Sequence, residues 1–270
     1  VMTKDRITSR ANPLVKRLRA LAADRKARES EGLYLCEGEV MLGEALASEA
    51  AICDVLYAAR TAQPLLDAAA ARGAVLTAAA DDIVSHCASV VSAQSVVFTV
   101  RIPAAKPCGS VERLLLLDGV ADPGNAGTIL RIADAFSFDA VWLTGACVDP
   151  YAPKVVRSAM GARFRIPTVS FAARADAVAA VRAHGLPLFG STLSSDSVPL
   201  DGVDLSRGCI ILGNEANGVS PELLAQCDRR VHIPMTGRAE SLNVAVAAGI
   251  LAYHSTQQRP VHTDARACTH

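Results

Sequence analysis

Apolar and polar positions alternate along the first hundred residues with the spacing of short strands and amphipathic helices. Compact apolar runs predict strands at 33–36, 53–59, 74–78 and 95–100. Helical periodicity between these runs predicts helices at 39–48, 64–73 and 81–90. We therefore expect an α/β unit in this half, with a parallel sheet covered on both faces.

The same alternation continues after residue 113. Apolar runs predict strands at 114–120, 140–145, 165–169, 186–191, 208–214 and 230–234. Helices are predicted near 128–136 and at 154–162, 174–185, 220–227 and 241–254. The last of these helices is apolar nearly all round, which predicts that it is buried. In parallel sheets ligands bind at the carboxyl ends of the strands, so the loops there are the candidates for chemistry.

A segment with two prolines, a glycine and two basic residues, 101–110, separates the two halves and predicts a linker. We accordingly divide the chain into an N-terminal domain at 1–105, a second domain at 106–256 and a disordered tail at 257–270. A length of 270 residues is sufficient for two domains with their own cores.

The first domain begins with a strongly basic stretch. Nine Lys or Arg lie between Lys4 and Arg28 against two Asp, and apolar positions recur at helical spacing over 13–29. Solvated helix faces normally mix both signs of charge, so this imbalance favours contact with RNA phosphates over an ordinary solvated face. The side chains expected to make that contact from this helix are Lys16, Arg17, Arg19 and Arg25.

Composition narrows the classes of protein further. The formal net charge is zero, so a nucleic-acid partner requires a local basic patch. The eight cysteines form no CxxC pair and have no histidine at zinc-ligand spacing, which predicts small buried side chains and no metal site. The polar N-terminus and the lack of an apolar run near 18 residues predict a cytoplasmic protein without a membrane span.

Three loops in the second half carry the candidate chemistry. The first, 118–131, holds Gly119, Gly124 and Gly127, whose small size would allow the backbone to approach an anionic ligand. Its glycine spacing differs from the dinucleotide fingerprint, and it lacks the lysine of a phosphate-binding loop. Asn125 suits a turn. Arg131 would lie in the first turn of the following helix, where the dipole disfavours a cation, so we expect an RNA phosphate as its partner.

The other two loops are 212–222 and 233–244. Glu215 and its neighbouring asparagines make the second loop a polar turn, which alone indicates no reaction. In the third loop Ser241 is explained by an N-cap role. Asn243 at the start of an apolar helix needs a hydrogen-bond partner, because an unsatisfied buried amide costs about 1–3 kcal/mol.

Together these loops resemble the three motifs of the SpoU (TrmH) family of RNA ribose methyltransferases. The matching segments are LDGVADPGNAGTILRIADAF, LGNEANGVSPELL and IPMTGRAESLNVAVAAGI, in the family's order. The N-terminal half resembles the family's substrate-binding domain through 7–21 and 31–46. The resemblance covers about residues 6–254 and departs at Ala216, where the family usually has glycine, and at 155–167, where the small residues are permuted.

The resemblance implies a SPOUT-type fold: a C-terminal parallel-sheet α/β domain with a deep trefoil knot, and a smaller N-terminal α/β substrate-binding domain. It implies a homodimer and an S-adenosylmethionine pocket formed by the second and third motifs. The residues implied to contact S-adenosylmethionine, some through their backbone, are Thr192 with its neighbour Ser191, Leu212, Gly213, Ile233, Met235, Ser241 and Leu242.

The resemblance also makes Arg131 the catalytic arginine, with Asn125, Glu215, Ser241 and Asn243 around it. A ribose 2'-hydroxyl must lose its proton as it attacks the methyl group. A guanidinium is a poor base because its pKa lies above about 12, so binding the phosphate and orienting the hydroxyl is the safer role, and both roles stay open. No metal is required. Outside the motifs, Arg157, Arg163 and Arg165 are expected to face RNA.

Four hypotheses follow. The first is 2'-O-methylation of ribosomal RNA, and the second is the same reaction on tRNA. The third is a non-catalytic RNA-binding module that keeps the fold, which the intact third motif disfavours. The fourth is a dinucleotide-dependent oxidoreductase, which the missing GxGxxG pattern argues against.

Overall fold

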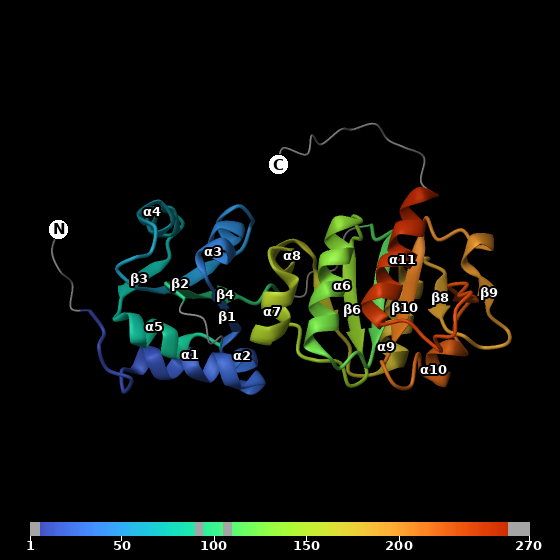
Figure 1. Ribbon diagram of the computed structural model, residues 1–270, viewed down its shortest axis with the longest axis horizontal. Coiled ribbons are helices and arrows are strands. Elements are labelled where there is room, and N and C mark those ends of the chain that lie inside the picture. The colour runs from blue at the N-terminus through green and yellow to red at the C-terminus, as the bar shows by residue number, and fades with distance from the viewer. Residues whose placement is uncertain (1–5, 90–93, 105–109, 259–270) are drawn as a thin grey trace.

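The computed structural model describes residues 6–89, 94–104 and 110–258. Two sheets, each covered by helices, lie one after the other along the long axis of the molecule (Figure 1). The N-terminal sheet has four strands and the C-terminal sheet has seven. The domain boundary expected at residues 105/106 stays a prediction, because residues 105–109 lie outside the described part, as do residues 259–270 of the expected tail.

The N-terminal sheet is mixed, so the prediction of a parallel sheet in this half is wrong. Its strands lie in the order β1-β4-β2-β3. The last strand of the unit returns between β1 and β2 and runs antiparallel to both, which leaves β2 and β3 as the parallel pair. The strand bounds are β1 (Leu33–Glu37), β2 (Ile52–Tyr57), β3 (Val75–Ala78) and β4 (Val96–Arg101).

Five helices surround this sheet: α1 (Pro13–Ala23), α2 (Arg25–Glu31), α3 (Glu39–Leu46), α4 (Gln63–Ala71) and α5 (Asp81–Cys87). The single basic helix predicted at 13–29 is in fact α1 and α2, because Asp24 between them is extended (φ −120°, ψ 124°). The Asp24 carboxylate caps α2 by accepting a hydrogen bond from the Lys26 amide at 2.9 Å.

The C-terminal sheet is parallel throughout, as predicted, with the order β7-β6-β5-β10-β8-β11-β9. All residues of β5, β6 and β10 are buried. The short β9 and the 3-10 turn η1 (Leu200–Gly202) were not predicted. The strand bounds are β5 (Arg113–Asp118), β6 (Ala140–Thr144), β7 (Thr168–Ser170), β8 (Leu188–Ser191), β9 (Val198–Pro199), β10 (Gly208–Gly213) and β11 (Arg229–His232).

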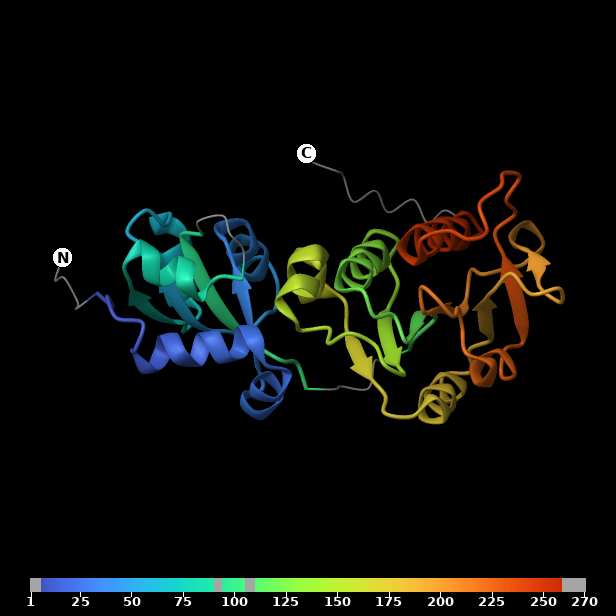
Figure 2. The ribbon, with the colours of Figure 1, turned by 60° about the horizontal axis from the view of Figure 1, so that its bottom comes forward.

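Helices cover both faces of this sheet, as Figure 2 shows with α6 and α11 above it and α9 below. Leu115 and Leu117 of β5 pack towards α6, α7 and α11, while Leu114 and Leu116 pack towards α9 and α10. The helix bounds are α6 (Pro123–Ala135), α7 (Pro153–Ala159), α8 (Ala162–Arg165), α9 (Arg174–Ala183), α10 (Pro221–Leu224) and α11 (Val244–Gln257).

Helix α6 begins five residues earlier than predicted. Asp122 caps it by accepting from the Asn125 amide at 2.8 Å, and Pro123 occupies its first turn. Arg131 therefore lies in the third turn, and its expected misfit with the helix dipole does not exist. Gly127 is buried where α6 crosses α7, since a Cβ there would lie 2.4 Å from Ser158 Cβ. This glycine permits helix packing, not the approach of a ligand.

The prediction that the last helix is buried is only partly met, because α11 has one exposed face. Ala248, Leu251 and Ala252 are fully buried against the sheet and α6. The opposite face leaves large apolar side chains in solvent: Val246 is 51%, Ile250 36% and Tyr253 56% exposed. No helix in the described ranges is long and apolar enough to cross a bilayer.

Helix α7 and the loop before it join the two units. Asp149 forms an ion pair with Arg28 of α2 at 2.6 Å, and both side chains are almost fully buried. The ring of Tyr151 lies 5.0 Å from that of Tyr34 on β1, and Val156 belongs to the N-terminal core. Figure 1 shows α7 and α8 between the two sheets. Both polar and apolar contacts therefore join the two units around α7, and we call this contact region the seam.

Candidate cofactor pocket and active site

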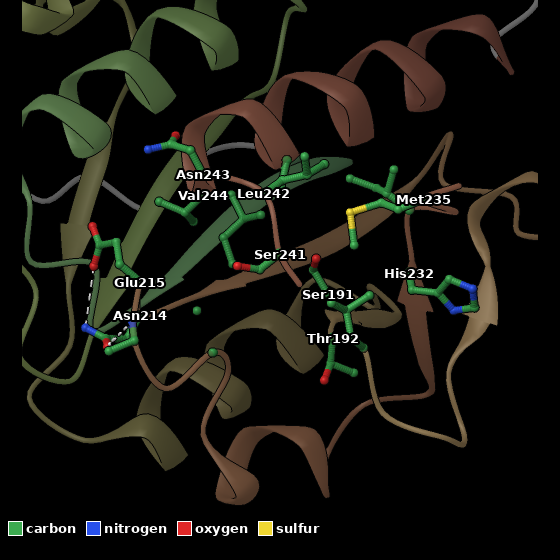
Figure 3. A pocket seen from close by; sticks show the side chains of 17 residues that line it. Ser191, Thr192, Asn214, Glu215, His232, Met235, Ser241, Leu242, Asn243 and Val244 are labelled. Carbon is green, nitrogen blue, oxygen red and sulfur yellow. Dashed lines mark hydrogen bonds between the residues drawn. The ribbon is translucent and has the colours of Figure 1, made fainter. Parts of the chain in front are cut away.

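A cavity of about 430 Å³ opens where β8, β10 and β11 end. Its walls are the three segments that follow these strands, together with the start of α11 (Figure 3). A cavity of this size at the carboxyl ends of parallel strands is suited to a small-molecule ligand. All the residues predicted to contact the cofactor line it: Ser191, Thr192, Leu212, Gly213, Ile233, Met235, Ser241 and Leu242.

Gly213, the last residue of β10, forms part of the cavity wall because it has no side chain. A Cβ at this position would lie 2.0 Å from the carbonyl carbon of Gly218. The loop folds back here, and Asn214 and Gly218 exchange two backbone hydrogen bonds of 2.9 Å. Ala216 in this loop does not have a positive φ, so alanine is accommodated where the family usually has glycine.

Asp118, at the end of β5, anchors the loop that follows β10 through a hydrogen bond. Its carboxylate is 2% exposed and accepts from the Ser220 amide and from Arg174 Nε, both at 2.8 Å. Sequence reasoning missed this residue. The available signal was an acidic side chain at the end of an otherwise apolar buried strand, which must have partners because an isolated buried charge is costly.

Three residues, one from each motif, form a chain of hydrogen bonds beside the cavity. Asn243 Nδ2 donates to Asn125 Oδ1 at 3.0 Å, and Asn125 Nδ2 donates to Glu215 Oε1 at 2.9 Å. Asn243 is also the N-cap of α11, because its Oδ1 accepts from the Ala245 amide at 2.9 Å. The partner that Asn243 was expected to need is thus present, and the cap role expected of Ser241 belongs to Asn243.

The Glu215 carboxylate is held in its charged form. Burial alone would raise its pKa, but hydrogen bonds from Asn125 and from the amides of Ala121 and Asp122 outweigh burial and lower it. Glu215 is therefore ionised at neutral pH. A carboxylate that already accepts four hydrogen bonds and has a lowered pKa is a weak proton acceptor, so its arrangement suits positioning.

Arg131 does not line the cavity in the single chain. It lies six residues after Asn125 on α6, which places its Cα about 9 Å further along the helix axis. Its side chain is exposed and has no hydrogen-bond or ion-pair partner among the described residues. The structure thus brings together Asn125, Glu215, Ser241 and Asn243 but leaves Arg131 free at the surface of α6.

The basic residues of the N-terminal helices differ in whether they form ion pairs. Arg17 pairs with Glu31 at 2.5 Å and with Asp54 at 3.1 Å, and Arg25 pairs with Glu29 at 2.7 Å. Lys16 and Arg19 are exposed on α1 and have no ion pair within the described ranges.

Arg19 of α1 lies close to His86 of α5. The pKa of His86 on α5 is lowered by burial and by the nearby charges of Arg10 and Arg19. Arg10 and Arg19 therefore both lie near His86, where Asp82 partly opposes their charge.

The three arginines expected to face RNA from 155–167 lie at the seam between the units. Arg157 bonds to Glu37 and to Ser89 Oγ, each at 2.8 Å. Arg165 binds Asp134 at 2.8 Å and Glu44 at 2.7 Å. Arg163 is 2% exposed, so the expectation of RNA contact does not fit its position.

Metal-ligating side chains do not cluster in the described ranges, where no group of three or more His, Cys, Asp or Glu could hold an ion. The six cysteines that the structure describes are free thiols. Burial raises the pKa of Cys36 and of Cys209 well above the usual value, as expected for small buried side chains.

Comparison with known proteins accounts for both units. Residues 112–253 match the model of the SpoU rRNA Methylase family, and residues 12–97 match the MRM3-like substrate binding domain. The chain is 34% identical over 249 residues to the 23S rRNA (guanosine(2553)-2'-O)-methyltransferase RlmP of Bacillus subtilis. That alignment covers 92% of this chain and 98% of RlmP.

Two solved structures match along nearly their whole length. An AdoMet-bound rRNA methyltransferase from Sinorhizobium meliloti superposes with a TM-score of 0.85 at 30% identity, covering 95% of this chain and 99% of that one. The SpoU methyltransferase AviRb from Streptomyces viridochromogenes, in complex with AdoMet, gives 0.80 at 29% identity, covering 92% and 98%. With the second and third motif loops lining one cavity, the first motif hydrogen-bonded to both, and both units matched, the chain belongs to the SpoU rRNA methylase family.

Proposed function

We propose that this protein transfers the methyl group of S-adenosylmethionine to a ribose 2'-hydroxyl of ribosomal RNA. The observation that carries the proposal is the cavity lined by the second and third motif loops, with Asn125 of the first motif hydrogen-bonded to Glu215 and Asn243 beside it. Similarity over the whole chain to a 23S rRNA 2'-O-methyltransferase supports the choice of reaction and of substrate class.

The cavity fits the chemistry of S-adenosylmethionine. Glu215 is the one acidic side chain in the lining that the structure describes, and its charge is opposite in sign to that of a sulfonium. Leu242 and Met235 offer apolar surface for an adenine ring, and Ser191 and Thr192 offer hydroxyls on the other side (Figure 3). The exposed backbone at Gly213 allows close approach to the ligand.

Bound S-adenosylmethionine supplies a methyl group that is already electrophilic on its sulfonium. The protein's task is to hold the ribose hydroxyl in line with that methyl group and to let its proton leave. Asn243 lines the cavity and donates to Asn125, which in turn donates to Glu215. We assign Glu215 a positioning role, because its lowered pKa makes it a poor base.

Arg131 is assigned to the phosphate next to the target ribose. Its guanidinium stays charged at any working pH, and its lack of a partner within the described ranges leaves it available to an oxyanion. A role as the base that takes the hydroxyl proton would require a neutral guanidinium, so phosphate binding and orientation of the hydroxyl is the role proposed.

A homodimer is part of the proposal. Val246, Ile250 and Tyr253 form an exposed apolar face on α11, and α11 packs beside α6, which carries Arg131. A second copy that covered this face would bring its own surface close to Arg131, so the active site would be completed near the subunit interface. Large exposed apolar faces of this kind usually mark association surfaces.

A trefoil knot in the C-terminal domain is also proposed. The chain leaves β11 near one edge of the sheet, yet the next helix, α11, packs against α6 and β10 on the other side of β8. The segment 233–243 therefore connects the two sides of β8, and the resemblance implies that the last segments of this domain are threaded.

The remaining RNA is proposed to bind the N-terminal unit through Lys16 and Arg19, near Arg10. Their freedom from ion pairs within the described part of the chain supports this choice over Arg17 and Arg25, which are paired. We also propose a cytoplasmic location. A tRNA substrate remains the alternative within the same reaction.

Calorimetry with S-adenosylmethionine tests whether the protein is an enzyme or a non-catalytic RNA-binding module. The proposal expects saturable binding at one site per chain. An absence of binding heat, together with intact RNA binding, would support the module instead.

A further inference from the structure

One wall of the cofactor cavity is a segment that the core of the domain does not hold. This segment, 192–197, connects β8 to β9, and its first two residues, Thr192 and Leu193, line the cavity. In the described part of the chain, none of its six residues belongs to a hydrophobic core cluster. Its two ends are attached to β11, because the Thr192 amide donates to the Val231 carbonyl at 3.0 Å and β9 pairs with β11 from Val198 onwards. The middle of the segment depends on side-chain contacts.

Strand β11 directs two polar side chains towards this segment. Val231 is fully buried in the core, and side chains alternate along a strand, so Arg230 and His232 lie on the opposite face. The Arg230 guanidinium forms an ion pair with Asp196. His232 Nδ1 lies 2.9 Å from Ser197 Oγ, and Figure 3 shows the His232 ring turned away from the centre of the cavity. Both contacts therefore hold the segment from outside the cavity.

The two contacts differ in how far water reaches them. The side chain of Asp196 is 56% exposed and that of Arg230 is 32% exposed, and ion pairs in solvent contribute little. His232 and Ser197 are each half-buried, so water competes less for their hydrogen bond. We therefore expect the contact between His232 and Ser197 to be the stronger of the two.

The direction of this hydrogen bond follows from the serine. A hydroxyl carries one hydrogen, and Ser197 donates it to the Ser194 carbonyl at 2.6 Å. The hydrogen between Ser197 and His232 must then come from the ring, with Nδ1 as the donor. An asparagine carries an amide nitrogen at the same position along the side chain and can replace this donor, whereas a leucine cannot.

We propose that His232 is a positioning residue for S-adenosylmethionine, because its hydrogen bond to Ser197 holds the segment 192–197 against β11. Thr192 and Leu193 are thereby kept in the wall of the cavity. A wall that is fixed before the ligand arrives lowers the entropy cost of binding. The imidazole acts through Ser197 and not on the methyl group, so cofactor affinity should depend on it and the transfer step should not. The inference rests on the proposed function, which makes S-adenosylmethionine the occupant of this cavity.

Titration calorimetry with S-adenosylmethionine on the full chain tests this role. His232→Leu is expected to weaken binding about tenfold, because the hydrogen bond and the order that it gives the segment are both lost. His232→Asn should stay within about twofold of the wild type, because its amide can donate to Ser197 Oγ. The matched control is His184→Leu, at the end of α9 and outside the cavity, which should bind as the wild type does.

A double-mutant cycle and steady-state kinetics separate this contact from a general loss of stability. Ser197→Ala should weaken binding by a similar factor, and adding it to His232→Leu should weaken binding no further, since both substitutions remove one interaction. In methyl transfer, His232→Leu should raise KM for S-adenosylmethionine about tenfold and leave kcat unchanged at saturating cofactor. Partial unfolding would lower kcat instead.

The outcomes distinguish this inference from the proposed function. Wild-type affinity in His232→Leu, binding by His232→Asn as weak as that by His232→Leu, or additive effects of the His232 and Ser197 substitutions would overturn the positioning role and leave the proposed function standing. An absence of S-adenosylmethionine binding by the wild-type chain would overturn the proposed function, and the positioning role with it.

Discussion

Asn243 Nδ2 lies 3.0 Å from Asn125 Oδ1, and this hydrogen bond joins the start of α11 to the start of α6. The two residues are 118 positions apart in the chain. Asn125 also donates to Glu215, 90 positions away, so one side chain connects all three motif loops. The shape of the cofactor cavity therefore depends on a side chain that does not itself line it.

Removing the Asn125 side chain should weaken the contacts that join the three motif loops beside the cavity. Asn125→Ala is expected to weaken S-adenosylmethionine binding about tenfold and to lower the free energy of unfolding by about 1 kcal/mol, because two hydrogen bonds at a partly exposed site are lost. Thr128→Ala, one turn further on the same helix, removes only a bond to the Gly124 carbonyl and serves as the control. Equal effects of the two variants on cofactor binding would contradict the connecting role.

Gly213→Ala should abolish cofactor binding. The new Cβ would lie 2.0 Å from backbone atoms of the Gly218 peptide, and the loop must move to relieve this overlap. We expect a loss of about 3 kcal/mol in the free energy of unfolding, measured by urea denaturation. Gly237→Ala is the matched control, because a Cβ there meets nothing within 4 Å. A Gly213→Ala protein with normal affinity and stability would rule out the close packing described.

Arg131 should affect transfer but not cofactor binding. Arg131→Ala is expected to reduce kcat/KM for methyl transfer about 100-fold or more, as loss of a phosphate-orienting cation does. The dissociation constant of S-adenosylmethionine should stay unchanged, because Arg131 does not line the cavity. Arg131→Lys should recover part of the activity. Full activity in Arg131→Ala would remove the assigned role.

The free cations of α1 should contribute to RNA affinity. The double variant Lys16→Ala, Arg19→Ala is expected to weaken RNA binding and to reduce the slope of log K against log salt by about 2, one for each phosphate that the variant no longer binds. Arg25→Ala should change the slope less, because Arg25 is paired with Glu29. Filter binding over a series of salt concentrations measures both effects. An unchanged slope in the double variant would place the RNA elsewhere.

Glu215 should stabilise the protein only where it is ionised. Its pKa is lowered in the folded state, so its contribution is present above the unfolded value of about 4.3 and is lost as pH falls through the folded value. Glu215→Gln should cost less than about 1 kcal/mol at pH 7, because the site is mostly solvated. That difference should disappear as the pH falls below the lowered, folded-state pKa of Glu215, measured by denaturant unfolding. A difference that grows as pH falls would contradict the assignment.

Local patterns predicted most elements of the chain, because apolar spacing reports which face of a strand or helix is covered. Two errors in the predicted helix bounds came from individual residues at helix ends. Asp24 breaks the basic helix, and Asp122 with Pro123 starts α6 early, so that Arg131 moved from the first turn to the third. The direction of β4 was missed, since an antiparallel strand with both faces covered has the same apolar pattern as a parallel one.

The cofactor pocket was predicted more fully than the polar contacts that support it. Resemblance to the motifs identified Gly213, Ile233 and Leu242 as lining residues, whereas the link through Asn125 depends on how three distant loops meet. The burial of Arg163 was equally hidden, because its neighbours Tyr34 and Tyr151 come from different units. The sequence around a charged residue does not indicate which distant segments will bury it in the fold.

Methyl transfer to unmodified ribosomal RNA tests the central claim most directly. The protein is incubated with tritiated S-adenosylmethionine and either ribosomal RNA or tRNA, and the labelled RNA is then hydrolysed with alkali. The account predicts label in ribosomal RNA, in an alkali-resistant dinucleotide, because a 2'-O-methyl group blocks cleavage at that ribose. Label in tRNA alone, label on a base, or no transfer by a protein that binds S-adenosylmethionine would contradict it.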